Sequence, residues 1–214
     1  MAENIIPIYS GPPDDFHWVG FGSGSGTNLR ECSKLITPAM VFSDRPKAGL
    51  LTLEELADVP KQVLNGYKAC GSWKKAKGYP EREAEYEKRS LEFNEHIVET
   101  LRRFEREVGY NIDLIVLGGY MRMVKEPLLT EFKDRMINVH PSELNLDHDH
   151  QRQYTGDDAV YDVLNDNYPV TRSSVIIVDQ GEDHGEILVQ GPELEVWEEF
   201  LNGWDPERQE CIRE

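Results

Sequence analysis

Short apolar runs alternate with stretches of helical periodicity along this chain, and that alternation restricts the fold more than any other feature. The apolar runs lie at residues 16–21, 39–43, 114–117, 136–139, 174–178 and 187–190. One helical pattern follows Asn28, another begins near Leu53, and the longest covers residues 80–108. Strands that alternate with helices usually pair in parallel. We therefore expect an α/β fold with a mainly parallel, doubly wound central sheet flanked by helices.

Length and charge limit the domain organisation and the partners. The 214 residues suffice for one α/β domain with a sizeable core, and we expect a single domain over residues 1–214. With 23 Lys and Arg against 40 Asp and Glu, the formal net charge is -17, which disfavours nucleic acid and anionic membranes as partners. Backbone N–H groups could still hold an anionic metabolite locally. A homodimer is compatible with this composition.

Cysteine and histidine usage bears on redox setting and metals. Cys32, Cys70 and Cys211 are an odd number without CxxC spacing, which predicts neither a disulfide framework nor a zinc site. Residues 1–11 lack the pattern of a leader, and no apolar run approaches membrane-spanning length, so we expect a soluble cytoplasmic protein. The residues His148-Asp149-His150 could ligate a metal, but a solvated loop is the favoured interpretation, and we expect no metal cofactor.

The segment Asn138-Val139-His140-Pro141 contains the strongest chemical signal. On a strand, residues two apart point to the same face, so the amide of Asn138 and the imidazole of His140 would lie side by side. Such a face can stabilise an oxygen that gains negative charge and can transfer a proton, as acyl transfer to an amine requires. The alternative is a turn asparagine followed by a surface histidine, and this motif alone does not decide between them.

A glycine-rich segment at residues 20–28 stands between an expected strand and an expected helix. Glycines permit close backbone approach, and a helix N-terminus offers unpaired N–H groups, so a phosphate is the natural ligand. The segment is not a Walker A loop, because no Gly-Lys-Ser/Thr follows. A tight structural turn is the alternative.

Two further charged segments have ordinary explanations. Residues 179–185, after the run at 174–178, contain three carboxylates and two glycines, which by themselves predict an acidic hairpin turn. The basic stretch at 66–79 contains Lys68, Lys74, Lys75 and Lys77, and we expect a solvated loop there.

Four segments taken in order resemble the folate-dependent formyltransferase family. They are GSGSGTNL at 22–29, DLIVLGGYMRM at 113–123, INVHPS at 137–142 and VDQGEDHG at 178–185. The resemblance implies a Rossmann-like formyltransferase fold. It also implies transfer of a formyl group from 10-formyltetrahydrofolate, as co-substrate, to a primary amine that carries phosphate, with glycinamide ribonucleotide of purine synthesis as the default acceptor.

The resemblance also implies roles for particular residues. The family's catalytic residues correspond to Asn138, His140 and Asp183, with Asp183 within hydrogen-bond reach of His140, directly or through one water. Its phosphate loop corresponds to Gly26, Thr27 and Asn28. Its folate pocket corresponds to Met121, Arg122, Met123 and Val124 together with the loop that contains Asp179 and Gly181.

The chain departs from the family pattern in three places. Residues 143–156 are longer, more polar and more charged than the family's loop, which puts substrate recognition in question. Residues 171–176 lack two histidines of the family, and the chain stops at Glu214 without the family's C-terminal helix, so that either the C-terminal part is truncated or the amine differs. A hydrolase of 10-formyltetrahydrofolate, a transferase for another amine and a binding protein without catalysis are the alternatives.

Overall fold

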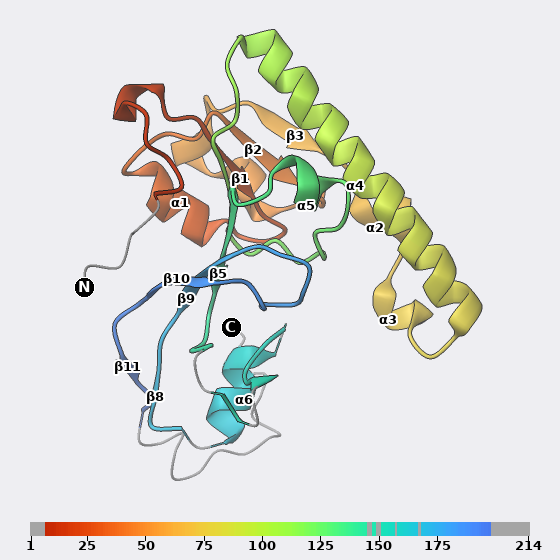
Figure 1. The fold of residues 1–214 in the computed structure, drawn as a ribbon, viewed down its shortest axis with the longest axis vertical. Helices are drawn as coiled ribbons and strands as arrows, with labels where there is room; N and C mark the ends of the chain where they lie inside the picture. The colour runs from red at the N-terminus through yellow and green to blue at the C-terminus, as the bar shows by residue number, and fades with distance from the viewer. Residues whose placement is uncertain (1–6, 145–146, 149–150, 157, 167, 198–214) are drawn as a thin grey trace. The chain divides into compact units, whose positions relative to one another are not determined.

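The computed structural model describes residues 7–144, 147–148, 151–156, 158–166 and 168–197. The chain divides into two compact units, Met1–Ile137 and Asn138–Glu214. Figure 1 shows both units and labels the α-helices and most of the strands. The division falls within strand β5 (Met136–His140), so this strand contributes residues to both units.

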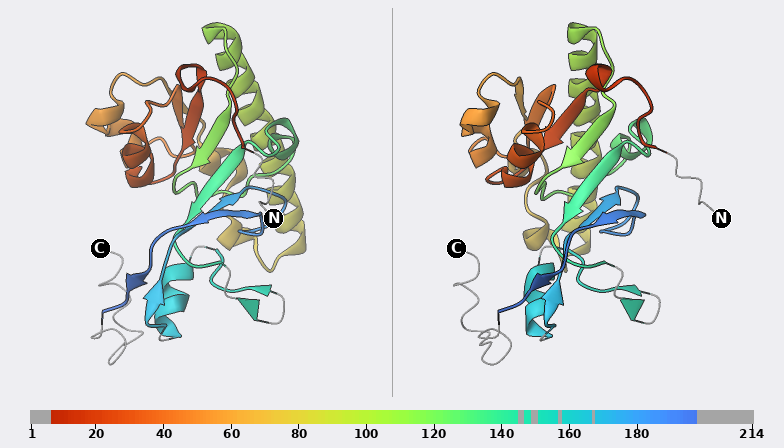
Figure 2. Two further views of the ribbon diagram at one scale, coloured as in Figure 1. Left: turned by 60° about the vertical axis from the view of Figure 1, so that its left-hand side comes forward. Right: turned by 90° about the vertical axis from the view of Figure 1, so that its left-hand side faces the viewer.

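Four parallel strands form the centre of the first unit. Strand β1 (Trp18–Phe21) lies between β2 (Met40–Ser43) and β4 (Leu114–Leu117), and β3 (Lys61–Val63) pairs with the other edge of β2. Every residue of β1 and β2 is buried, as expected for parallel strands that are covered on both faces. Figure 2 shows these strands between α1 (Thr27–Ser33) on one side and α4 (Pro80–Val108) on the other. The expected parallel α/β arrangement is confirmed.

Helix α4 has the boundaries that its sequence predicts. It begins at Pro80 and ends at Val108. The next residue, Gly109, has a φ of 82°, the left-handed conformation typical of the residue after a helix. Its apolar stripe buries Phe93, Ile97 and Leu101. The short helices α2 (Gly66–Cys70) and α3 (Trp73–Ala76) pack against it. Two further short elements of this unit are η1 (Pro13–Asp15) and α5 (Leu128–Glu131).

Parts of the first unit differ from the sequence-based expectation. The prediction of a helix that begins near Leu53 is wrong. The chain forms two 3-10 turns there, η2 (Gly49–Thr52) and η3 (Glu54–Leu56). Leu53 is extended between them, and both turns pack apolar side chains on Val41. The segment 66–79 contains α2 and α3 where a loop was expected. Strand β3 is polar and short, so no apolar run predicts it.

The second unit consists of short strands and one helix. Its elements after β5 are β6 (Asp147–His148), β7 (Gln151–Arg152), α6 (Ala159–Asn165), β8 (Val170–Thr171), β9 (Ser174–Ile177), β10 (Ile187–Gln190) and β11 (Leu194–Glu195). Strands β9 and β10 are antiparallel, as are the small pairs β6–β7 and β8–β11. The strand order of the seven-stranded sheet is β10-β9-β5-β4-β1-β2-β3.

Neither a membrane span nor a metal cluster occurs in the part of the chain that the structure describes. No helix there is long and apolar enough to cross a bilayer. No group of three or more His, Cys, Asp or Glu side chains is arranged to hold a metal ion. Residues 149–150 of the histidine-containing loop lie outside the described residues.

Candidate active site

Three side chains of the second unit that the resemblance selects as catalytic lie in contact. Asn138 and His140 are two residues apart on β5, and Asp183 lies in the loop between β9 and β10. The Nδ1 atom of His140 is 3.2 Å from Oδ2 of Asp183. The Nδ2 atom of Asn138 donates to Oδ1 of the same carboxylate at 3.1 Å. The expected contact between His140 and Asp183 is therefore present, and we call these three residues the trio.

The carboxylate of Asp183 is held in its charged form. Burial by itself would raise the pKa of Asp183, but hydrogen bonds from His140, from the Gly156 backbone N–H and from Asn138 outweigh it, and the pKa lies below its usual range. The bond from Gly156 N–H to Oδ2 is 2.8 Å long. Asp183 has a φ of 50°, a left-handed conformation that aspartate tolerates better than most residues. An ionised carboxylate in this position can sustain a positive charge on His140.

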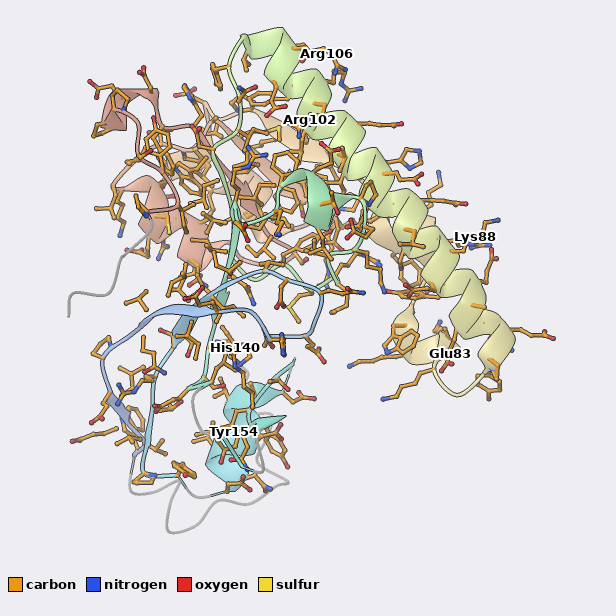
Figure 3. All side chains as sticks on the ribbon, in the orientation of Figure 1. Glu83, Lys88, Arg102, Arg106, His140 and Tyr154 are labelled. Atoms are coloured by element: carbon orange, nitrogen blue, oxygen red, sulfur yellow. The ribbon has the colours of Figure 1, made fainter. Side chains whose placement is uncertain are left out.

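The ring of His140 is buried between two acceptors, with 3% of the residue exposed. Its Nδ1 faces the Asp183 carboxylate, and its Nε2 lies 2.6 Å from the Tyr154 carbonyl oxygen and 3.0 Å from Ser142 Oγ. A carbonyl oxygen only accepts, so a proton on Nε2 would bond the Tyr154 carbonyl and a proton on Nδ1 would bond the Asp183 carboxylate. A ring with a proton on each nitrogen would satisfy both acceptors. Figure 3 labels His140 and Tyr154 among the surrounding side chains.

Ser142, His140 and Asp183 are ordered like the triad of a serine hydrolase, but the serine cannot act as a nucleophile here. Ser142 has no exposed surface, and its hydroxyl donates to the Tyr154 carbonyl at 2.7 Å. A nucleophile must reach the substrate carbon and must pass its proton to the histidine. The side chain that can still contact a ligand is instead Asn138, because it is only half-buried and has a second N–H on its amide nitrogen.

The segment 152–156, where the sequence departs from the family, contributes three groups around the trio. The Arg152 guanidinium donates to the carbonyls of Asp183 and Gly185, the Tyr154 carbonyl faces His140, and the Gly156 N–H binds Asp183. Sequence reasoning selected none of the three. Two of them act through the backbone, which leaves no side-chain signal in a sequence.

The glycine-rich loop belongs to the first unit and leads into α1. Gly26 is the residue before the helix and has a φ of 77°, and a Cβ atom there would lie 2.4 Å from Leu50 Cβ. Glycine is thus required by both conformation and space. Thr27 and Asn28 form the first turn of α1 and are exposed. The hydroxyls of Ser25 and Thr27 are 3.1 Å apart.

The residues expected at the folate pocket within the first unit differ in exposure. Met121 and Met123 are 47% and 46% exposed, whereas Val124 is buried. The Arg122 side chain points into the unit, where its Nε donates to Oδ2 of the buried Asp44 at 2.9 Å. Arg122 could therefore contact a ligand through its backbone, because its guanidinium already forms this ion pair.

Asp179 and Gly181, the other residues expected at the folate pocket, lie in the loop after β9 in the second unit. Oδ2 of Asp179 is 3.0 Å from Nδ1 of the exposed His184, and the Gly181 N–H donates to the Asp179 carbonyl. Oδ1 of Asp179 is buried and has no hydrogen-bond partner among the described residues. An unpaired buried acceptor suits a ligand that offers N–H donors.

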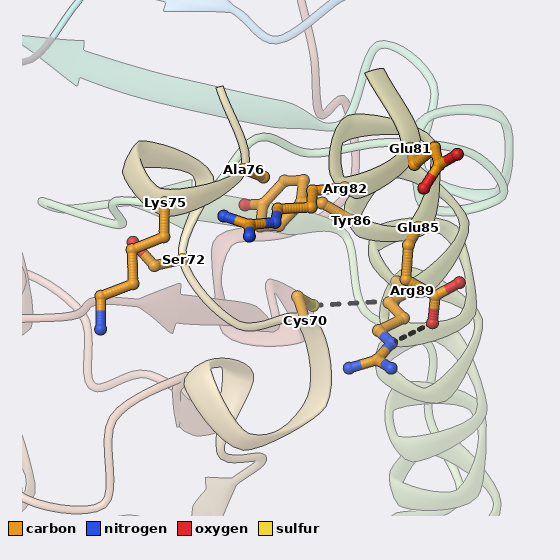
Figure 4. Close-up of a pocket in the computed structure, with 9 residues that line it drawn as sticks. All are labelled: Cys70, Ser72, Lys75, Ala76, Glu81, Arg82, Glu85, Tyr86 and Arg89. Atoms are coloured by element: carbon orange, nitrogen blue, oxygen red, sulfur yellow. Dashed lines mark hydrogen bonds and ion pairs between the residues drawn. The ribbon is translucent and has the colours of Figure 1, made fainter. Parts of the chain in front are cut away.

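An open pocket of about 410 Å³ lies between α2, α3 and the start of α4 (Figure 4). Its polar lining includes Lys75, Arg82 and Arg89 as well as Glu81 and Glu85, so charges of both signs are present. Arg89 is already paired with Glu85 at 2.6 Å. The pocket contains none of the residues that the sequence selected for catalysis or binding.

Comparisons with known proteins identify relatives of this chain. The family model described as Formyl transferase matches residues 19–199. The phosphoribosylglycinamide formyltransferase of Bacillus subtilis is 28% identical over 177 residues, which cover 79% of this chain and 75% of that protein. The trifunctional purine biosynthetic protein adenosine-3 of Bos taurus is 29% identical over 175 residues, which cover 78% of this chain and 14% of that protein.

Solved structures agree with this assignment. The phosphoribosylglycinamide formyltransferase from Bacillus halodurans has a TM-score of 0.63 at 26% identity, and the match covers 92% of this chain and 86% of that chain. The protein of that name from Streptococcus pneumoniae has the same TM-score at 22% identity, with 87% and 89% covered, which supports the fold.

Proposed function

The chain belongs to the formyl transferase family, and on that premise we propose that it transfers a formyl group from 10-formyltetrahydrofolate to a primary amine. The contact of Asp183 with both His140 and Asn138 is the observation that carries the proposal, because it joins an amide donor, an imidazole and a charged carboxylate. Glycinamide ribonucleotide is the proposed acceptor, since the relatives from Bacillus subtilis and Bacillus halodurans are named phosphoribosylglycinamide formyltransferases.

The trio would act on the formyl carbon when the amine attacks it. The folate donor supplies the formyl group as an amide on N10, and its oxygen becomes negative during attack. The free N–H of Asn138 would donate to that oxygen, and the imidazolium of His140 would add a positive charge nearby. Asp183 would keep His140 protonated and would help move the proton that leaves the amine toward N10. The products are the formylated amine and tetrahydrofolate.

The binding residues rest on the resemblance and on local chemistry. We propose that Gly26, Thr27 and Asn28 bind the phosphate of the acceptor through backbone N–H groups. We propose folate contacts for Met121, Met123 and Val124, and for the backbone of Arg122. The exposed thioethers of the two methionines suit a flat heterocycle.

The folate contacts of Asp179 and Gly181 are likewise proposed. The unpaired Oδ1 of Asp179 suits a ligand that carries N–H donors. No step of the proposed reaction needs a metal ion.

Organisation and setting are also proposals. We infer that residues 1–214 form one functional domain, because the family match at 19–199 spans both compact units. A cytoplasmic location fits the small-molecule substrates that we propose. A homodimer stays a prediction.

The proposal is tested by the absorbance change on release of tetrahydrofolate from 10-formyltetrahydrofolate, measured with and without glycinamide ribonucleotide. We expect release that depends on the amine and a formylated product of matching amount. Equal release in both samples, with formate as product, would support the hydrolase alternative, in which water replaces the amine. Absence of release with this amine and with other primary amines would contradict the transferase proposal.

A further inference from the structure

The segment 152–156 is the part of the second unit that departs most from the family pattern and that also touches the trio. It surrounds His140 and Asp183 with three hydrogen-bonding groups, spaced two residues apart. Two of these groups, the Tyr154 carbonyl and the Gly156 N–H, contact the reactive side chains directly. The third, Arg152, donates to the backbone of the loop that carries Asp183.

The contacts of Arg152 are short and converge on one nitrogen. Its Nη1 donates to the Asp183 carbonyl at 2.7 Å and to the Gly185 carbonyl at 2.7 Å. A guanidinium is always charged and holds its donors in a rigid plane, so it fixes the direction of the oxygens that it binds. Arg152 thereby ties the backbone on both sides of His184.

The loop that Arg152 binds has a conformation that needs support. Asp183 has a φ of 50°, a sparsely populated conformation for a residue with a side chain, although aspartate adopts it more readily than most. At Gly185, an added Cβ would lie 1.7 Å from the Ile177 carbonyl oxygen, so this end of the loop is packed against β9. The direction of the Asp183 carboxylate therefore depends on backbone contacts around it.

The middle of the segment is also anchored, through Tyr154. The Tyr154 hydroxyl donates to Oδ2 of Asp166 at 3.0 Å, directly after α6. The Tyr154 ring is buried with Ala159 and Val163 and meets the Tyr168 ring edge-on. Arg152 thus extends from a segment that is fixed to α6, and it can hold the loop of Asp183 in place.

We propose that Arg152 is a positioning residue, which sets the Asp183 carboxylate against His140 and Asn138 by binding the carbonyls of Asp183 and Gly185. This inference rests on the proposed function, because positioning is measured by its effect on formyl transfer. A direct role in binding a phosphate or carboxylate of the substrate is the competing interpretation, and the two differ in the kinetic constant that they change.

The kinetic test uses Arg152→Ala and Arg152→Gln in the full chain. We expect kcat to fall about 10²-fold in Arg152→Ala, the effect of a misplacement of about 1 Å in a catalytic group. Both KM values should stay within about 3-fold, since the substrates keep their contacts. Added guanidinium should restore part of kcat in Arg152→Ala, and Arg152→Gln should be intermediate because its amide keeps a donor. Arg172→Gln is the matched control, since Arg172 pairs only with carboxylates of Glu143 and Glu193 in the described residues, and it should leave kcat unchanged.

A second measurement separates this inference from the proposed function. Ring N–H protons of His140 bound to Asp183 and Tyr154 should give downfield proton NMR signals, assigned by their loss in His140→Ala. These signals should be present in the wild type and in Arg172→Gln, and absent in Arg152→Ala, whether or not formyl transfer is observed. If Arg152→Ala does not fold, the His140 signals of Arg152→Gln are compared with those of the wild type instead.

Three results would overturn the inference. Unchanged signals and an unchanged kcat in Arg152→Ala would mean that the loop holds its conformation without Arg152. A raised KM with normal kcat would assign Arg152 to ligand binding. A loss of activity that guanidinium does not restore, with the His140 signals intact, would exclude positioning.

Discussion

Replacement of Asp183 by asparagine keeps the size of the side chain and changes what each of its atoms can do. In the wild type, Oδ2 accepts from His140 and from the Gly156 N–H, while Oδ1 accepts from Asn138. Asparagine has one acceptor oxygen, and the two donors near Oδ2 favour its placement there. Its amide nitrogen then faces the amide nitrogen of Asn138. Asn138 must turn its amide over, and it loses the free N–H that we propose for the oxyanion contact.

The expected loss of activity follows from these two changes. Loss of one oxyanion donor lowers kcat by about 10²- to 10³-fold. Loss of the negative charge also removes support for the imidazolium of His140. We expect kcat of Asp183→Asn to fall about 10³-fold, which is about 4 kcal/mol of transition-state stabilisation. The KM for the folate should change by less than about 3-fold, because these interactions strengthen in the transition state.

The same substitution changes the pH dependence of stability. Burial alone would raise the pKa of Asp183, but its hydrogen bonds lower it below the usual range. The pKa in the folded state is thus below the unfolded value of about 3.9. Asp183 therefore stabilises the fold above about pH 4, and this contribution is lost as the pH falls through the folded-state pKa. Asp183→Asn should lower the free energy of unfolding at pH 7, and its difference from wild type should shrink toward pH 2.

Single-turnover release of tetrahydrofolate and urea unfolding at several pH values measure these effects. Asp162→Asn is the control, because it changes the charge by the same amount as Asp183→Asn. Asp162 lies on α6 and touches none of the trio in the described residues. Burial first, and then Asp158 and Asp166, raise the pKa of Asp162, so its replacement should not destabilise the fold at pH 7. A kcat of Asp183→Asn within 10-fold of wild type would refute the reasoning about the trio.

Three further outcomes are expected. Asn138→Ala and His140→Ala should each lower kcat by about 10²-fold or more while circular dichroism stays unchanged, and near-normal turnover would remove these residues from catalysis. Gly26→Ala should lower the free energy of unfolding in urea by about 1–3 kcal/mol, because its φ is 77° and its Cβ would meet a leucine side chain, and an unchanged midpoint would contradict this packing. Arg122→Met should cost about 3–5 kcal/mol in the same assay because it leaves the buried charge of Asp44 without its positive partner, and Arg122→Met with Asp44→Leu should recover part of the loss if the ion pair is the cause.

Local patterns predicted several of the elements and two of the three residues of the trio. Residues 80–108 carry a proline at the start, a glycine after the end and a continuous apolar stripe, and these signals act within the helix itself. Asn138 and His140 share a strand face because side chains alternate along any strand. The assignment of Asp183 to the trio came from the resemblance, since nothing in residues 179–185 by themselves distinguishes a catalytic carboxylate from a hairpin turn.

Tertiary structure decided which groups face one another. The ion pair of Arg122 with Asp44 directs the guanidinium of a residue expected to bind folate into its own unit, toward a partner 78 residues away. The Tyr154 carbonyl and the Gly156 N–H reach His140 and Asp183 through backbone atoms, which every residue type has. Such contacts depend on how distant segments pack. They also depend on where the chain turns, and Tyr154, whose φ is positive, is one such turning point. A sequence shows the local preference of each segment, whereas the direction of a backbone group toward a distant side chain exists only in the packed fold.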